Sequence, residues 1–184
     1  MKELSLHILD IVQNSIAADA NLIDIKIVEN LAIDKLIIEV VDNGRGMEEE
    51  MTERVKDPFV TGRKTRKVGL GIPLLYEACT RCGGDLRIES EIGKGTKVIC
   101  WFKHSHIDRA PLGNMIDTIL TLIMGNPHID ITYLHIIDER EMRFDTREVR
   151  KVLGEVPINE PQVLSWIRDY LKEGFNSIYG GANI

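Results

Sequence analysis

The stretch KLIIEVVDNGRGM, residues 35–47, holds the strongest structural signal in this sequence. Its first part is rich in branched apolar residues, which predicts a β-strand over residues 35–41. Gly44 and Gly46 follow, and glycines around a sharp turn let the backbone approach a flat ligand closely. The carboxylate of Asp42, at the strand end, can accept a hydrogen bond from an exocyclic amine such as that of adenine. Asp-Asn-Gly is also an ordinary turn sequence, so the role of this stretch depends on its neighbours.

Upstream, residues 4–20 carry apolar side chains with the period of an amphipathic helix. Asp10 and Asn14 are four positions apart, so they project from one face of that helix. An amide oxygen suits Mg²⁺ beside the oxygens of a triphosphate. A carboxylate one turn earlier can deprotonate a water or hydroxyl that attacks the γ-phosphate. A solvated polar stripe explains the same spacing, so the pair alone does not decide its role.

Downstream, Gly69-Leu70-Gly71 leads into a predicted helix that ends at Arg81. Free N–H groups and the helix dipole favour phosphate at such a start, although a glycine pair suits any flexible helix entry. Residues 56–68 show no periodicity and are predicted as a mobile loop. The basic side chains of this loop are phosphate contacts or parts of a solvated loop; they are Arg63, Lys64, Arg66 and Lys67.

The remaining pattern of the first half consists of short elements. Alternating isoleucines predict a strand over residues 23–27, and an acidic helix is predicted over residues 48–55. Residues 86–91 and 96–103 are predicted as two strands of a hairpin, joined by a glycine-rich turn.

Taken in order, these motifs resemble those of the GHKL ATP-binding superfamily, which includes gyrase, the heat-shock chaperone ATPases, sensor histidine kinases and MutL. The N box of the family resembles residues 10–15, its first glycine box residues 42–46 and its second residues 69–71. Asp57-Pro58-Phe59 and Gly93-Lys94-Gly95-Thr96 fit the same order. The resemblance covers residues 4–103 and implies a Bergerat-type two-layer α/β sandwich, with a mixed sheet and helices on one face.

The resemblance also implies roles for single residues. Asp42 would bind the adenine amine with support from Thr96, and Asn14 would bind Mg²⁺. Gly44 and Gly46 would shape the adenine pocket. Residues 56–68 would form the ATP lid. The residues implied at the phosphate end of the site are Arg63, Lys64, Lys67, Gly69, Leu70 and Gly71.

Three departures from the family pattern affect the expected activity. Asp10 stands where hydrolysing members and serine kinases typically have Glu, and a carboxylate there favours hydrolysis or phosphorylation of a hydroxyl. Lys67 stands where kinases commonly have the first glycine of the second box. The N box begins within ten residues of Met1, which leaves no room for the two-helix unit that presents a phosphoacceptor histidine. We therefore expect a stand-alone domain that acts on a separate protein partner, not a standard sensor kinase.

Beyond a predicted hinge over residues 104–113, the pattern starts afresh. Helices are predicted over residues 111–124, from Asp145 to Leu153, and from Pro161 to about Lys172, with strands over residues 129–137 and 141–144. The tail from residue 176 is predicted to be loose. These elements predict a small α+β module, residues 104–184, after an ATP-binding domain of residues 1–103. Docking to a partner or homodimerisation is its expected role.

Composition narrows the class of protein. The chain has 184 residues and a formal net charge of −6, which argues against a nucleic-acid coat. No apolar run is long enough for a bilayer or a signal peptide, and three cysteines make no disulfide framework, so we expect a cytoplasmic protein. Three functions stay open: a Mg²⁺-ATP-dependent protein kinase, an ATP-hydrolysing conformational switch, and a non-catalytic nucleotide-sensing or anti-sigma-like module.

Overall fold

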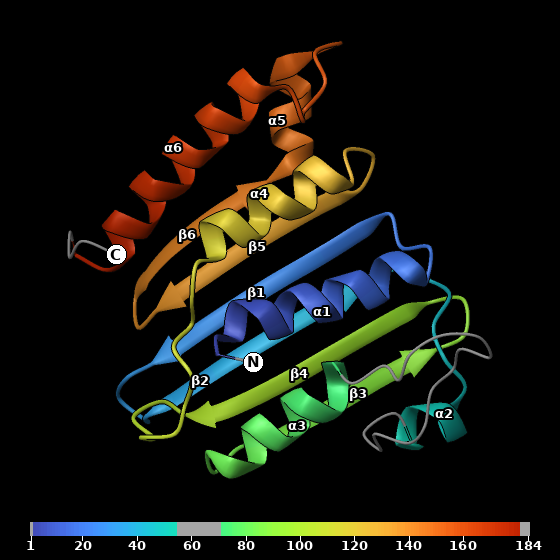
Figure 1. The fold of residues 1–184 in the computed structure, drawn as a ribbon, viewed down its shortest axis with the longest axis vertical. Helices are drawn as coiled ribbons and strands as arrows, with labels where there is room; N and C mark the ends of the chain where they lie inside the picture. Colours follow the sequence, from blue (N-terminus) through green and yellow to red (C-terminus); the bar gives the residue numbers. More distant parts are fainter. Residues whose placement is uncertain (1, 55–70, 181–184) are drawn as a thin grey trace.

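A single mixed β-sheet forms the framework of the protein (Figure 1). The computed structural model describes residues 2–54 and 71–180. The strands pair in the order β3-β4-β2-β1-β5-β6; β1 and β5 are parallel and the other neighbours are antiparallel. The elements are α1 (Leu4–Ala17), β1 (Leu22–Asn30), β2 (Lys35–Asp42), α2 (Glu49–Arg54), α3 (Gly71–Arg81), β3 (Asp85–Glu91), β4 (Gly95–Lys103), α4 (Met115–Gly125), β5 (Asp130–Ile137), β6 (Arg140–Asp145), α5 (Thr146–Leu153) and α6 (Pro161–Ile178).

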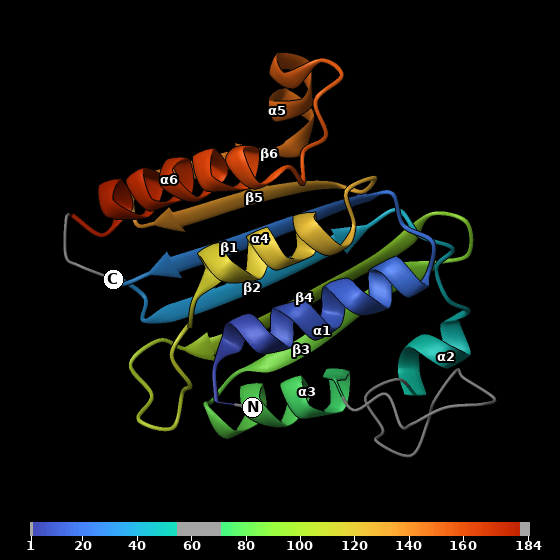
Figure 2. The ribbon, with the colours of Figure 1, turned by 45° about the horizontal axis from the view of Figure 1, so that its top comes forward.

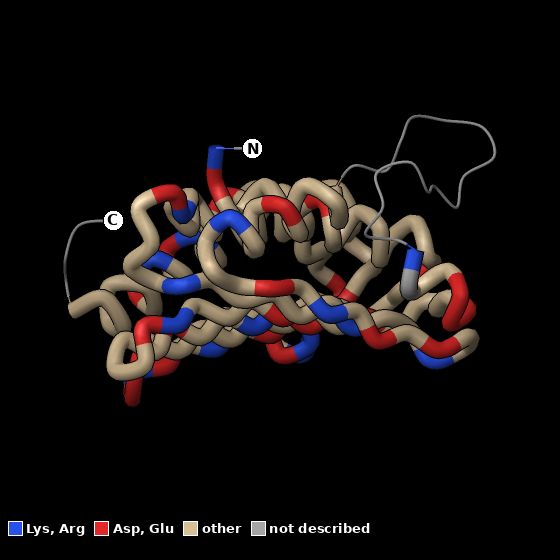
Figure 3. The backbone as a smooth tube through the Cα atoms, turned by 90° about the horizontal axis from the view of Figure 1, so that it is seen from below, with Lys and Arg blue, Asp and Glu red and all other residues tan. Residues whose placement is uncertain are grey.

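The core lies between one face of this sheet and the helices. Alternate residues of β1, such as Ile23 and Ile25, are buried, and they lie beside buried Ile131 and Tyr133 of β5. Helices α1, α3, α4 and α6 cover that face, as Figure 2 and the side view of Figure 3 show. In Figure 3 the Lys, Arg, Asp and Glu residues are interspersed along the chain. The predicted two-layer α/β sandwich with a mixed sheet and helices on one face is confirmed.

Two predicted helix boundaries are wrong in the second half of the chain. Helix α4 begins at Met115, not at residue 111, because the side chain of Asn114 caps it by accepting from the N–H of Asp117. Helix α6 continues to Ile178, so the predicted loose tail begins too early. Its apolar face continues past the predicted end through Phe175 and Ile178, which are both buried.

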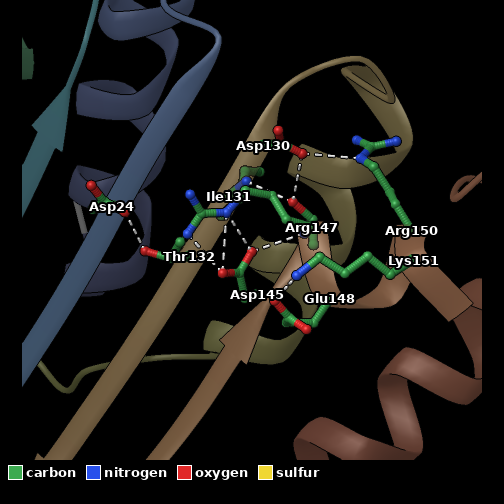
Figure 4. Close-up of polar contacts among 10 residues, drawn as sticks. Asp24, Asp130, Ile131, Thr132, Asp145, Arg147, Glu148, Arg150 and Lys151 are labelled. Atoms are coloured by element: carbon green, nitrogen blue, oxygen red, sulfur yellow. Dashed lines mark hydrogen bonds and ion pairs between the residues drawn. The ribbon is translucent and has the colours of Figure 1, made fainter.

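Strands β5 and β6 extend the same sheet as the strands of the first half. The division of the chain into two domains at residue 103 stays a prediction. Polar contacts fasten α5 to the start of β5, as the close-up in Figure 4 shows. The carboxylate of Asp130 accepts from Arg150 Nε at 3.0 Å and from Thr146 Oγ1 at 3.2 Å. Asp145 caps α5 by accepting from the N–H of Arg147 at 2.8 Å.

No helix within residues 2–54 and 71–180 is both long enough and apolar enough to cross a membrane.

Candidate functional site

Asp42 lies at the end of β2 and is buried, with 8% of its surface exposed. Three donors hold its carboxylate. The hydroxyl of Ser15 donates to Oδ2 at 2.6 Å, and the backbone N–H groups of Gly44 and Thr96 donate to Oδ1 at 2.8 and 3.3 Å. An ionised carboxylate has only acceptors to offer a ligand. The site therefore presents a fixed hydrogen-bond acceptor at the strand end.

Ser15 was not assigned a role from the sequence, although it follows Asn14 directly in the N box. It is buried on α1, and its hydrogen bond to Asp42 joins that helix to the end of β2. A small hydroxyl residue in a helix is too common to be singled out from sequence alone. Its importance appears only when α1 is placed over the sheet.

Asp10 lies one turn before Asn14 on α1, as the spacing predicted. Asp10 is half-buried, and this burial raises the pKa of its carboxyl above the ordinary value. The start of α3 packs against it, because a Cβ placed on Gly71 would lie 3.1 Å from the Asp10 Cβ. Asn14 is exposed, so its amide is open to a ligand. The structure thus brings the predicted acid and the end of the second glycine box together.

His7 lies one turn before Asp10 and is buried. Burial lowers its pKa to about 4, so the ring is neutral at pH 7. Within the described part of the chain, its Nδ1 is the one buried side-chain polar atom without a hydrogen-bond partner. A neutral buried imidazole adds no positive charge beside Asp10.

Of the other predicted site residues, Gly46 and Thr96 lie in the described part of the chain and the rest lie outside it. Gly46 adopts a φ of 69° and packs against the carbonyl of Glu91 at the end of β3. Thr96 supports Asp42 through its backbone N–H. Its hydroxyl does not contact Asp42 but shares a hydrogen bond of 2.9 Å with Ser90 Oγ. The predicted residues that lie outside the described part are Arg63, Lys64, Lys67, Gly69 and Leu70, together with the lid of residues 56–68.

The donor set on α1 suits Mg²⁺ more than a transition metal. Asn14 offers an amide oxygen, and oxygen is the ligand atom that this hard ion prefers. Over residues 2–54 and 71–180, no group of three or more His, Cys, Asp or Glu side chains is placed to hold a metal. Mg²⁺ usually takes one or two protein ligands and completes its shell with phosphate and water, so the residues present fit it.

Replacing Ser15 by alanine is expected to lower the free energy of unfolding by about 2 kcal/mol, because a buried carboxylate loses a charge-assisted donor. Urea denaturation followed by circular dichroism measures this loss. The control is Ser177→Ala on α6, where an exposed hydroxyl donates to Gly174 of its own helix, and we expect less than about 0.5 kcal/mol there. Equal losses in the two variants would show that the bond between Ser15 and Asp42 contributes nothing special.

Comparisons with known proteins match this site to a family. A profile described as histidine kinase-, DNA gyrase B-, and HSP90-like ATPase matches residues 2–106. Sporulation kinase D of Bacillus subtilis (strain 168) is 44% identical over 64 residues, which are 35% of this chain and 12% of that kinase. A putative sensor protein of Shewanella frigidimarina (strain NCIMB 400) is 28% identical over 103 residues, 53% of this chain and 15% of that protein. The chain thus spans a small part of the length of these relatives.

Solved structures share the fold over nearly the whole chain. The crystal structure of the N-terminal domain of a DNA repair protein matches 98% of this chain and 58% of its own, with a TM-score of 0.56 and 17% sequence identity. The ATPase domain of Aquifex aeolicus MutL complexed with ADP matches 92% of this chain and 88% of its own, with a TM-score of 0.50 and 17% identity. Because the family profile covers more than half of its residues, this chain belongs to the histidine kinase-, DNA gyrase B-, and HSP90-like ATPases.

Proposed function

We propose that this protein binds ATP with Mg²⁺ and transfers the γ-phosphate to a hydroxyl group of a separate protein partner. The observation that carries the proposal is the carboxylate of Asp42, which is buried, held by three donors and left with only acceptors to offer. Such a group selects a ligand that supplies an N–H donor, as the exocyclic amine of adenine does. Membership of the ATPase family supports ATP as that ligand.

In the proposed reaction Asp10 accepts the proton of the attacking hydroxyl. Burial raises its pKa, and a carboxylate of higher proton affinity is a better base at neutral pH. Asn14, one turn further along α1, would hold Mg²⁺ with the phosphate oxygens. When bound, the ion neutralises negative charge on those oxygens. Gly69, Leu70 and Gly71 are proposed at the phosphate end, with Lys64 and Lys67 as phosphate contacts.

Transfer to a partner is favoured over hydrolysis alone by one observation, which is that the aligned relative from Bacillus subtilis is named a kinase. The carboxylate of Asp10 would serve either reaction. A homodimer, with residues 104–184 in contact, stays a prediction. The ATP-hydrolysing switch and the nucleotide sensor remain distinguishable outcomes of the experiment below.

The test compares the wild-type protein with Asp42→Asn and Asp10→Asn. Calorimetry with Mg²⁺-ATP is expected to show binding that Asp42→Asn weakens about 100-fold, because the new amide N–H₂ faces the adenine amine. Asp10→Asn is expected to bind ATP with unchanged affinity but to transfer no label from γ-labelled ATP to proteins of a cell extract. Label transfer that survives Asp10→Asn would remove Asp10 as the base, and wild-type protein that binds no ATP would overturn the proposal.

Phosphate release measured in parallel separates the other functions. Release by purified wild-type protein without a partner, abolished by Asp10→Asn, would identify a self-sufficient ATPase switch. Binding with neither release nor transfer would identify a nucleotide sensor.

A further inference from the structure

Residues 104–114, here called the connector, join β4 to α4 and run beside the start of α1 (Figure 1). The first end of the connector is fixed to the turn between β1 and β2. Ser105 donates to the Asp34 carboxylate through its N–H and its hydroxyl, both at 2.7 Å. The backbone N–H of His104 donates to the carbonyl of Asp34 at 2.9 Å. This end of the connector is therefore fixed to the end of the sheet at which β1 ends.

The same end of the connector shares a half-buried carboxylate with the second half of the chain. Glu29 of β1 accepts from His104 Nε2 at 2.7 Å, from His135 Nε2 of β5 at 2.9 Å and from the hydroxyl of Tyr179 at 2.5 Å. The side chain of His135 is fully buried and that of Glu29 is 12% exposed. Tyr179 is the C-cap residue of α6. One carboxylate thus ties the connector to β5 and to the end of α6.

The other end of the connector caps helix α1. The carbonyls of Pro111 and Leu112 accept from the backbone N–H groups of Leu4 and Ser5 at 3.0 and 2.8 Å. These N–H groups belong to the first turn of α1, where a side chain usually serves as the acceptor. The N-cap residue Glu3 makes no such side-chain bond. The connector therefore supplies the cap of the helix that carries Asp10 and Asn14.

Gly113 allows this close contact. Its φ is 82°, and a Cβ there would lie 2.3 Å from Glu3 Oε2 and 2.5 Å from Ser5 Oγ. The ends of the Glu3 and Ser5 side chains can rotate away, but a Cβ on Gly113 would also lie 2.8 Å from the Glu3 Cβ, which rotation leaves in place. A side chain at this position therefore strains the contact between the connector and α1. By contrast, a Cβ on Gly125, in the last turn of α4, would meet nothing within 4 Å. Gly125 has no positive φ, so Gly125→Ala controls for the added methyl group alone.

We infer that the connector couples the position of Tyr179, which contacts the connector through Glu29, to the first turn of α1. Through that turn it also couples the C-terminal half to the nucleotide site. A partner that binds residues 115–180 and shifts the end of α6 would then alter nucleotide affinity. By linkage, nucleotide would alter the affinity for that partner by the same factor. The part of the inference that concerns nucleotide rests on the proposed function.

The direct test is amide hydrogen exchange at Leu4 and Ser5, measured by NMR without nucleotide. Tyr179→Phe keeps the ring and removes one hydroxyl at the far end of the connector, and it is expected to speed exchange at both amides about tenfold. Gly113→Ala is expected to give a similar or larger increase, and Gly125→Ala none. Ser105→Ala, at an exposed position on the same end as Tyr179, is the second variant should Tyr179→Phe fold poorly. If both variants at that end leave exchange at Leu4 and Ser5 unchanged, the two ends of the connector are independent and the inference is wrong.

Calorimetry with Mg²⁺-ATP on the same variants tests the link to the nucleotide site. Tyr179→Phe and Gly113→Ala are expected to weaken ATP binding about fivefold, at the lower end of usual coupling, and Gly125→Ala is expected to leave it unchanged. Faster exchange with unchanged ATP affinity would overturn the transmission to the nucleotide site. A wild-type protein that binds no ATP would count against the proposed function, while the exchange data would still decide whether the connector transmits.

Discussion

Replacing Gly95 by alanine is expected to destabilise the protein by about 4 kcal/mol, the largest loss that we predict for a single substitution. Gly95 begins β4 with a φ of 104°, and a Cβ there would lie 1.9 Å from the carbonyl oxygen of Asp42. That contact is with backbone, so no side chain can rotate to relieve it. The expected response is a displacement of the end of β2, which also moves the Asp42 carboxylate.

Gly93 provides the control within the same hairpin. Its φ is 78°, but a Cβ on Gly93 would meet nothing within 4 Å. Gly93→Ala therefore carries only the conformational cost of a left-handed residue, about 1 kcal/mol. Thermal and urea denaturation measure both variants. Similar losses in the two would show that the approach of Gly95 to Asp42 is not a constraint on the fold.

Replacing Glu29 by glutamine is expected to cost about 3 kcal/mol at pH 7 and almost nothing near pH 2. Burial alone would raise the pKa of this carboxyl, but hydrogen bonds from His135, Tyr179 and His104 outweigh it and lower the pKa to about 2, against 4.5 in the absence of these contacts. Because folding lowers the pKa of this carboxyl, its charge stabilises the folded state at every pH above the pKa that it has in the unfolded chain. This stabilisation is lost as the pH falls from about 4.5 through about 2.

Urea denaturation of the wild type and Glu29→Gln at pH 7, 5, 4 and 3 measures this effect. The difference between the two proteins should be largest at pH 7 and should shrink steadily below pH 5. Glu139→Gln, at an exposed position in the turn between β5 and β6, is the matched control and should change little at any pH. A difference that stays constant down to pH 3 would mean that Glu29 contributes through packing and not through its charge.

The parts of the fold that the sequence predicted are those with a strong local signal. Strand β2 carries a run of branched residues, and the alternation of Ile23, Ile25 and Ile27 identifies β1. The ends of α4 and α6 were placed less well. In the sequence Asn114 is an ordinary polar residue, and only the structure shows that its side chain caps α4 by accepting from the N–H of Asp117. Gly174 interrupts the apolar pattern of α6 in the sequence, although in the structure it packs against Met142.

For the candidate site, sequence reasoning found the residues and missed the contacts that hold them. Asp42 was identified by its place at a strand end, but Ser15 became its partner only through the packing of α1 on the sheet. Glu29 reads as one more charged residue at the end of a strand, yet its carboxylate is half-buried because β5 and α6 pack beside it. Contacts between residues as distant as Glu29 and His135, 106 positions apart, leave no local trace in the sequence.

The parallel pairing of β1 with β5 also sets an order of events during synthesis. One edge of β1 can pair at once with β2, which follows it directly in the sequence. The other edge of β1 can pair only after β5 has been synthesised, where Asp130 lies opposite Leu22. Until then a strand bearing Ile23, Ile25 and Ile27 presents unpaired backbone groups to other chains. Pairing across so long a loop is slow because closing the loop costs entropy before any contact is gained. While only the first half has emerged, we therefore expect this protein to be most exposed to aggregation.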